Sequence, residues 1–193
     1  DNLAWKLDLV VKGLAPDSLL DTYSEERVRA ADENILNSVR ATDFLTPKTE
    51  ISKTFRNAVL KLAQQHAFAR PLVNSGRLST PCVYDGLSLN GPDELDGPAR
   101  SRVGATCADA PMAEGFLLNR LGGDFTLLAL NTTPPDMADT DGIALRTITL
   151  ETSRDDPTGA IAARYLGDQP QGIYLIRPDQ HIVARWATAS AAE

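Results

Sequence analysis

The side chains best suited to nucleophilic or redox chemistry are the two cysteines, Cys82 and Cys107. They form no Cys-x-x-Cys pair, and no base or second cysteine next to Cys107 is placed to lower its thiol pKa. Taken with the two histidines, His66 and His181, they give no spacing typical of a zinc site. We therefore expect no structural metal and an inert, partly buried Cys107.

The candidates for acid–base chemistry are the histidines and one charged run. His66 and His181 have no carboxylate or nucleophile at a spacing that indicates a catalytic pair, so we expect both to be structural or exposed. Glu25 and Glu26 stand beside arginines within residues 27–29 and could form an acid–base group. Charges on an exposed helix face are usually solvated or weakly paired, which is the interpretation we favour.

The remaining polar and aromatic candidates are an acidic loop and two tryptophans. Asp136, Asp139 and Asp141 are hard oxygen ligands, but they lack the spacing and the closing Glu of an EF-hand calcium loop. A solvated loop is expected there. Trp5 and Trp186 are expected to pack in a core or an interface. The sequence thus predicts no catalytic, cofactor-binding or metal-binding residue in this chain.

Composition limits the kinds of partner. The net charge of −7 argues against duplex nucleic acid and against an anionic membrane surface, because both require clustered Lys and Arg. No stretch approaches the roughly 20 apolar residues of a membrane helix, and no signal peptide is visible, so a cytoplasmic location is expected. The chain starts with Asp1, directly in an amphipathic pattern, which suggests a fragment of a longer protein.

The elements that must position these side chains begin with helices. Apolar residues recur at helical spacing over residues 2–12, and Gly13 supplies a left-handed stop. A start signal at residues 16–18 opens a second, long helix whose apolar stripe reaches Val39. The opening of the chain is therefore predicted to be helical.

A third helix and a long connection follow. Thr49 or Ser52 can cap a helix whose apolar positions continue to Ala69, before Pro71. Residues 74–103 are rich in Gly, Pro, Ser and Asp with little periodicity, and we interpret them as a surface connection. We expect a helical segment at 1–73, a linker at 74–103 and a separate domain at 104–193.

The last part of the chain alternates between strand and helix patterns. Residues 125–130 and 172–176 are short apolar runs, and residues 143–150 alternate with β-branched side chains. A helix is predicted at 156–166, and a hairpin returns the chain through residues 181–186. The expected fold class is α/β, with a mixed sheet.

The first residues resemble a known enzyme family. The opening Asn-Leu-Ala-Trp-Lys-Leu at residues 2–7, followed by Leu-Asp-Thr-Tyr at 20–23 and by Glu26 and Arg27, is similar to the segment just after the second flavin motif of class A FAD-dependent aromatic-ring hydroxylases. Arg29 departs from the proline that relatives often carry, which lets the helix continue unbroken.

The second half resembles the carboxyl-terminal domain of the phenol hydroxylase and 3-(3-hydroxyphenyl)propionate hydroxylase branch of that family. The matching stretches are Ala-Asp-Ala-Pro at 108–111, the run at 125–128, Arg-Tyr with Gly at 164–167, and Leu-Ile-Arg-Pro-Asp at 175–179. Gln180 stands where relatives often have glycine. The resemblance implies N-terminal helices followed by a thioredoxin-like α/β domain.

The resemblance implies that this chain is the non-catalytic carboxyl-terminal region of an FAD-dependent monooxygenase that hydroxylates phenolic substrates with NAD(P)H and O2. Its implied partners are the FAD and substrate domains, and a second copy in a homodimer. The Gly-rich phosphate-binding turn and the second flavin motif are not in this sequence, so we expect the chain itself to bind no FAD.

Two other functions remain open. A stand-alone thioredoxin-like redox module would need a cysteine just after the first core strand, but residues 131–135 read Asn-Thr-Thr-Pro-Pro. An independent binding adaptor would be favoured if the isolated chain were a stable monomer whose gene encoded nothing upstream. We also expect an exposed apolar stripe, containing Leu3, Leu7, Leu20 and Tyr23, through which the chain self-associates.

Overall fold

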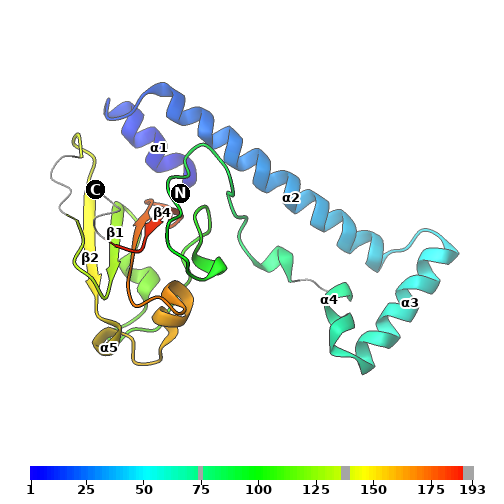
Figure 1. Cartoon of the computed structure of the whole chain (residues 1–193). Helices are drawn as coiled ribbons and strands as arrows, with labels where there is room; N and C mark the ends of the chain where they lie inside the picture. Colours follow the sequence, from blue (N-terminus) through cyan, green and yellow to red (C-terminus); the bar gives the residue numbers. More distant parts are fainter. Residues whose placement is uncertain (74–75, 136–139, 189–193) are drawn as a thin grey trace. The chain divides into compact units, whose positions relative to one another are not determined.

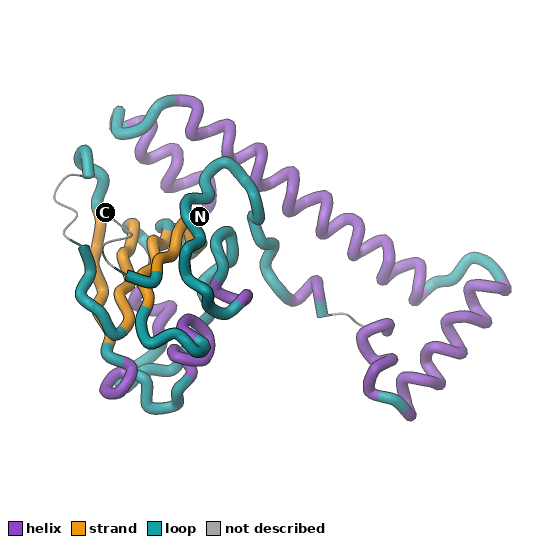
Figure 2. The backbone as a smooth tube through the Cα atoms, viewed as in Figure 1, coloured by secondary structure: helices purple, strands orange, loops and turns teal. Residues whose placement is uncertain are grey.

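The computed structural model describes residues 1–73, 76–135 and 140–188 (Figures 1 and 2). Its contacts divide the chain into two compact units. The sheet unit comprises Asp1–Glu26 and Val83–Glu193, and the helical unit comprises Arg27–Cys82. These boundaries differ from the expected divisions at 73/74 and 103/104, because the opening helix and most of the expected linker belong with the sheet.

A four-stranded mixed sheet organises the sheet unit. The strands are β1 (Phe125–Leu130), β2 (Leu145–Leu150), β3 (Gly172–Ile176) and β4 (Ile182–Trp186), in the spatial order β2-β1-β3-β4. β1 pairs in parallel with β2 and antiparallel with β3, and β3 pairs antiparallel with β4. The expected α/β class with a mixed sheet is confirmed, and three of the four strands begin within one residue of the predicted position.

The core lies on both faces of β1. Because side chains alternate along a strand, Leu128 and Leu130 point to one face while Leu127 and Ala129 point to the other. The larger cluster adds, among others, Leu117, Ile161, Tyr165, Tyr174 and Ile176. The smaller adds Ile173, Ala184 and Trp186. The apolar run of β1 is thus buried on both sides, which is why it could be recognised as a strand.

The connection from β2 to β3 corrects the helix predicted at 156–166. Instead, α5 (Thr152–Asp155) ends at Asp156, and a π-helical turn, η6 (Ala162–Leu166), follows. Asp156 precedes Pro157 and has φ −118° and ψ 73°, since proline disfavours a helical conformation in the residue before it. Asp156 Oδ2 then accepts a hydrogen bond from Ala162 N at 2.9 Å, so it helps to begin the second segment.

Residues 83–124 are mostly irregular. Within them, residues 83–103 belong to the predicted surface connection at 74–103, and for these residues that interpretation is wrong. Tyr84, Leu95 and Val103 are buried. Gly91 N donates to Val183 O at 2.9 Å, so this segment covers the free edge of β4. Gly104 has φ +83°, and a Cβ there would lie 2.8 Å from the Tyr84 carbonyl, which explains the glycine. Two short 3-10 turns, η4 (Ala99–Ser101) and η5 (Leu117–Arg120), complete the segment.

The predicted opening helices are present. α1 (Asn2–Val11) is followed by Gly13 at φ +72°, as expected from its stop signal. A short 3-10 turn, η1 (Asp17–Leu20), leads into α2 (Asp21–Leu45), which begins in the sheet unit and continues in the helical unit. No helix among the residues that the structure describes is long and apolar enough to cross a membrane.

The helical unit has almost no core of its own. α3 (Glu50–Gln65) starts at the predicted cap, with Ser52 N donating to Thr49 Oγ1 at 3.1 Å. It stops at His66 (φ −130°), earlier than predicted, and η2 (Ala67–Ala69), α4 (Arg70–Val73) and η3 (Arg77–Ser79) follow. Among its described side chains, the buried ones are Ala30, Val59 and Ala69. Far fewer side chains are buried in the helical unit than in the sheet unit.

Candidate functional site

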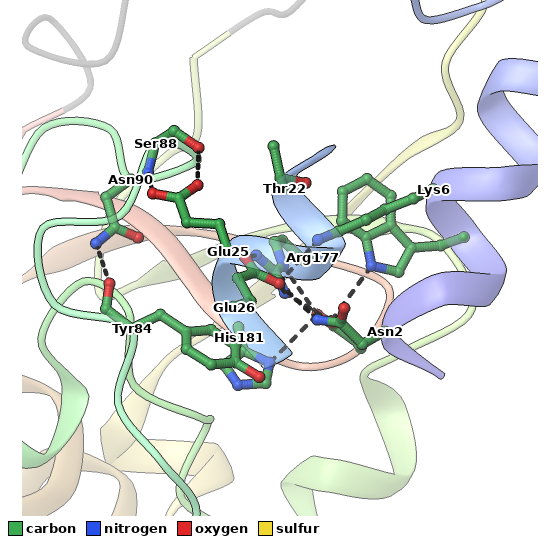
Figure 3. A network of polar contacts seen from close by, with 12 residues as sticks. Asn2, Lys6, Thr22, Glu25, Glu26, Tyr84, Ser88, Asn90, Arg177 and His181 are labelled. Atoms are coloured by element: carbon green, nitrogen blue, oxygen red, sulfur yellow. Dashed lines mark hydrogen bonds and ion pairs between the residues drawn. The ribbon is translucent and has the colours of Figure 1, made fainter. Parts of the chain in front are cut away.

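A buried cluster of charges in the sheet unit is linked by a network of polar contacts (Figure 3). Glu26, in the first turns of α2, accepts from Lys6 Nζ at 2.8 Å and from Asn2 Nδ2 at 2.6 Å, both on α1. Arg177, which follows β3, donates a hydrogen bond from each of its two terminal nitrogens to the two oxygens of the same carboxylate. One carboxylate therefore joins two helices to the sheet.

A second carboxylate, Asp179 in the β3–β4 turn, completes the cluster. Arg177 Nε donates to its Oδ1 at 2.9 Å, and Nη2 donates to its Oδ2 at 2.6 Å. Asn2 Nδ2 and Trp5 Nε1 also donate to Oδ2, at 3.1 and 3.3 Å. We call these six residues, Asn2, Trp5, Lys6, Glu26, Arg177 and Asp179, the ionic cluster. Its two cations and two carboxylates balance.

Burial and pairing set the protonation of the cluster. Lys6 and Glu26 are 0% and 1% exposed. Burial alone would raise the pKa of the Glu26 carboxyl, but hydrogen bonds from Arg177 hold that pKa below its ordinary value. Burial would also raise the pKa of the Asp179 carboxyl, but its contacts with His181 and Arg177 outweigh burial. The pKa of Asp179 is therefore lowered as well. Carboxyls held ionised in this way cannot serve as general acids near neutral pH.

Aromatic rings enclose the cluster. The Arg177 guanidinium lies 5.3 Å from the Trp5 ring centre and 5.8 Å from that of Tyr84, within cation–π range. Trp5 meets Phe125 edge to face at 5.4 Å, and Tyr84 stacks on His181 at 4.7 Å. The rings lie beside ion pairs whose side chains are at most 4% exposed.

An open groove of about 770 Å³ lies beside the cluster, between α1 and the loops that precede β1 and β2. Its charged rim includes Asp1, Asp8 and Asp124, and its cation Lys12 is already paired with Asp8 at 2.7 Å. A dinucleotide pyrophosphate needs free backbone N–H groups at a helix start, or cations. The rim is therefore mainly acidic, and we derive no redox step from the residues of this chain.

The charged run of α2 is only partly as predicted. Arg27 and Arg29 are exposed, and Glu25 is exposed and accepts from Ser88 N at 3.2 Å. The expectation of solvated or weakly paired charges is wrong for Glu26, which is buried in the ionic cluster. Its partner Arg177 is remote in sequence, so helical spacing alone could not reveal the pair.

The two cysteines and the two histidines lie in different surroundings. Burial raises the pKa of the Cys107 thiol to about 12. Burial, and then a hydrogen bond to Glu33 Oε2 at 2.8 Å, raise that of Cys82 to about 11. His66 is exposed, with its ring 5.8 Å from that of Phe68. His181 has Nδ1 3.3 Å from Asp179 Oδ1, a contact that is not aligned as a hydrogen bond.

The remaining candidates from the sequence are the acidic loop and Trp186. Asp136 and Asp139 lie outside the described residues, and Asp141 stands in a turn at φ +49°. Within residues 1–73, 76–135 and 140–188, no group of three or more His, Cys, Asp or Glu side chains could hold a metal ion. Trp186 packs in the smaller core cluster as expected.

Sequence reasoning missed most of the ionic cluster. Lys6 offered a signal, because it is a single cation between Leu3 and Leu7 in a mainly apolar helix. Arg177 and Asp179 flank Pro178 in a turn, where charges usually indicate exposure. Their burial follows only once α1 and α2 pack over that turn.

The sequence of this chain is similar to an FAD-binding family model and to aromatic hydroxylases. Residues 1–38 match a family model described as FAD binding domain. The chain is 31% identical over 197 aligned positions to the uncharacterized aromatic compound monooxygenase YhjG of Bacillus subtilis, covering 99% of this chain and 35% of that protein. A 3-(3-hydroxy-phenyl)propionate/3-hydroxycinnamic acid hydroxylase of Escherichia coli is 48% identical over 58 residues, which cover 30% of this chain and 10% of that protein.

Solved structures agree on the fold. The flavin-dependent monooxygenase PieE, in complex with FAD and substrate, superposes with a TM-score of 0.67 at 25% identity, covering 99% of this chain and 41% of that one. Aklavinone-11 hydroxylase, in a ternary complex with FAD and aklavinone, gives 0.64 at 23% identity, covering 100% and 37%. The chain thus spans about a third of the length of its relatives.

Proposed function

We propose that this chain, which belongs to the family of FAD-dependent aromatic hydroxylases, is the region in which the end of an FAD-binding domain is clamped to a non-catalytic α/β domain. The observation that carries this proposal is the ionic cluster. Asn2, Lys6 and Glu26 lie in the segment that matches the FAD binding domain model, while Arg177 and Asp179 lie in the β3–β4 turn. The buried ion pairs fix one to the other.

The complete enzyme, on this proposal, hydroxylates a phenolic compound with NAD(P)H and O2. Support comes from the printed activities of the relatives, a monooxygenase of aromatic compounds and a hydroxylase of hydroxyphenylpropionate. The flavin would supply the oxygen chemistry. The residues of this chain contribute the fold that holds the two domains together, and no catalytic, cofactor-binding or metal-binding residue.

The test of the parent activity uses the product of the complete reading frame. We expect it to purify with bound FAD and to oxidise NAD(P)H faster when phenolic compounds such as 3-(3-hydroxyphenyl)propionate are added. A flavin-free product that leaves NAD(P)H unchanged with every phenol tried would refute the proposal.

The 193-residue chain itself is expected to bind no FAD. FAD fluorescence, followed while the chain is titrated into the flavin, should stay at its value in buffer. Saturable binding at micromolar concentration would show that the acidic groove, or another surface, holds flavin after all.

The proposed partners are the FAD and substrate domains of the parent and a second copy of the chain. Leu3 and Leu7 of the expected apolar stripe are 40% and 45% exposed, and Leu20 and Tyr23 are half-buried. The helical unit exposes a greater number of large apolar side chains, Phe55 and Phe68 among them. Exposed apolar surface of this extent supports an interaction role.

A thiol oxidoreductase is the alternative that the sheet order favours, and the thiols argue against it. β1 ends at Leu130, and the chain continues into Asn131, Thr132 and Thr133. A redox-active protein of this fold would carry its cysteine there. With thiol pKa values of about 11 and about 12, only a small fraction of either cysteine is ionised at neutral pH. Insulin reduction with dithiothreitol should match a control without protein. Turnover lost in Cys107→Ser would support the alternative.

A further inference from the structure

We propose that α3 (Glu50–Gln65) is a self-association helix, which packs antiparallel against the α3 of a second copy of this chain. The inference deepens the homodimer part of the proposed function and rests on it. It starts from the exposure of three large side chains on one stripe of α3. Ile51, Phe55 and Leu62 are 83%, 64% and 37% exposed.

The stripe has the spacing of a helix-pairing seam. Ile51, Phe55, Ala58 and Leu62 follow one another at intervals of four, three and four, the alternation of the a and d positions of a heptad. Val59, next to this stripe, is 6% exposed, in contrast to the stripe itself. In Figure 1, α3 is the cyan helix that follows α2 in the chain. The helix thus has one face buried within its own unit and a neighbouring apolar face without cover.

The seam is complementary to itself in size. In an antiparallel pair with its two-fold axis between positions 56 and 57, Ile51 lies opposite the partner's Leu62. Phe55 lies opposite the partner's Ala58, so each bulky ring meets a small side chain. A two-fold axis repeats every contact in both directions, as isologous interfaces require. A parallel pair would instead bring the two Phe55 rings together, which favours the antiparallel arrangement.

The charges along the seam have the same symmetry. Glu50 and Lys61 lie on the same side of the stripe, near its two ends, so antiparallel pairing places Glu50 beside the partner's Lys61. Among the described residues Lys61 has no ion-pair partner, and Glu50 pairs with Lys53 at 2.7 Å in a largely exposed contact. Opposite charges at the flanks of a helix pair set its orientation. This charge complementarity favours a second copy of the chain as the partner of the exposed stripe on α3.

Sedimentation velocity of the 193-residue chain over roughly 1–500 µM tests the inference. A seam of four positions is short, so we expect a dimer with half-association at roughly 10–100 µM. Phe55→Glu should weaken association at least tenfold. The matched control is Leu60→Glu, which adds the same charge on the opposite side of the same helix and should change association less than twofold. Circular dichroism checks that both variants keep their helix content.

Charge exchange tests the orientation. Glu50→Lys and Lys61→Glu should each weaken association about threefold at low salt, and the two together should restore it to within twofold. A dimer that resists Phe55→Glu, or that Leu60→Glu or Leu3→Glu weakens equally, would overturn the α3 seam while leaving a homodimer in place. A strict monomer at every concentration would overturn both, with the parent activity tested separately by NAD(P)H oxidation.

Discussion

The sheet unit and the helical unit of this chain use their apolar residues in opposite ways. The sheet unit buries β1 on both faces and encloses the two cations and two carboxylates of the ionic cluster. In the helical unit, few side chains are buried, and many large apolar ones are exposed, including Val28, Ile35, Leu45, Ile51 and Phe55. A fold that is complete in itself buries such residues. The contrast supports the proposal that a partner covers the helical unit.

The strongest test of this contrast is Arg177→Met, which leaves Glu26 and Asp179 buried without their main cation. Removing one partner of a buried ion pair costs about 3–5 kcal/mol. Both tryptophans, Trp5 and Trp186, lie in the sheet unit, so their fluorescence in urea reports its unfolding. We expect the urea midpoint to fall sharply, or the unit to be unfolded in buffer.

Its control is Arg100→Met, because Arg100 is an exposed arginine of the same unit. The free energy of unfolding of that variant should stay within about 0.5 kcal/mol of the value for the unsubstituted chain. Equal losses in the two variants would show that the ionic cluster contributes nothing particular to stability.

Truncation of one apolar side chain in each unit sharpens the comparison. Leu128→Ala empties a 0% exposed position of β1 and should cost about 2–5 kcal/mol in the free energy of unfolding. Phe55→Ala removes a ring that is 64% exposed, so in dilute solution its cost should be within about 0.5 kcal/mol. Urea denaturation, followed by circular dichroism, measures the free energy of unfolding of both variants. Similar losses in the two would contradict the exposed position of Phe55 on α3.

Acid should weaken the sheet unit through the cluster carboxyls. Because the pKa values of Glu26 and Asp179 are lower in the folded than in the unfolded chain, the unfolded chain takes up protons first as pH falls. Their stabilisation is therefore fully present above about pH 5 and is lost progressively below it. The urea midpoint from tryptophan fluorescence should be unaffected by these two groups between pH 6 and 8 and should decline from pH 5 to 3. A midpoint that rises on acidification would reverse the assigned shifts.

The smallest expected effect is confined to the helical unit. Thr49→Ala removes the side-chain cap of α3 and should cost about 1 kcal/mol of helix stability. Thr54→Ala, in the interior of the same helix, should not destabilise it, because alanine has the higher helix propensity. Thermal melting followed at 222 nm should separate the two variants, while tryptophan fluorescence stays unchanged in both.

What the sequence determined is the set of elements with a strong local signal. β1 and β3 have the predicted bounds, because a short apolar run between turn residues identifies a strand buried on both faces. The caps and stops at Thr49 and Gly13 were equally local, since each satisfies backbone groups within one turn of itself. Strand and helix patterns over residues 125–186 indicated the α/β class. Family motifs at the two ends of the chain added the expectation of a thioredoxin-like domain.

What only the tertiary structure decided is which polar residues are buried. Glu26 resembles any exposed helix charge until the turn that carries Arg177 packs against it, 151 positions further along the chain. The segment that contains Tyr84 and Leu95 resembles a linker until it covers the edge of β4. Local patterns encode backbone conformation, because that depends on near neighbours. Burial of a charge depends on partners that are distant in sequence, and only the assembled fold brings them together.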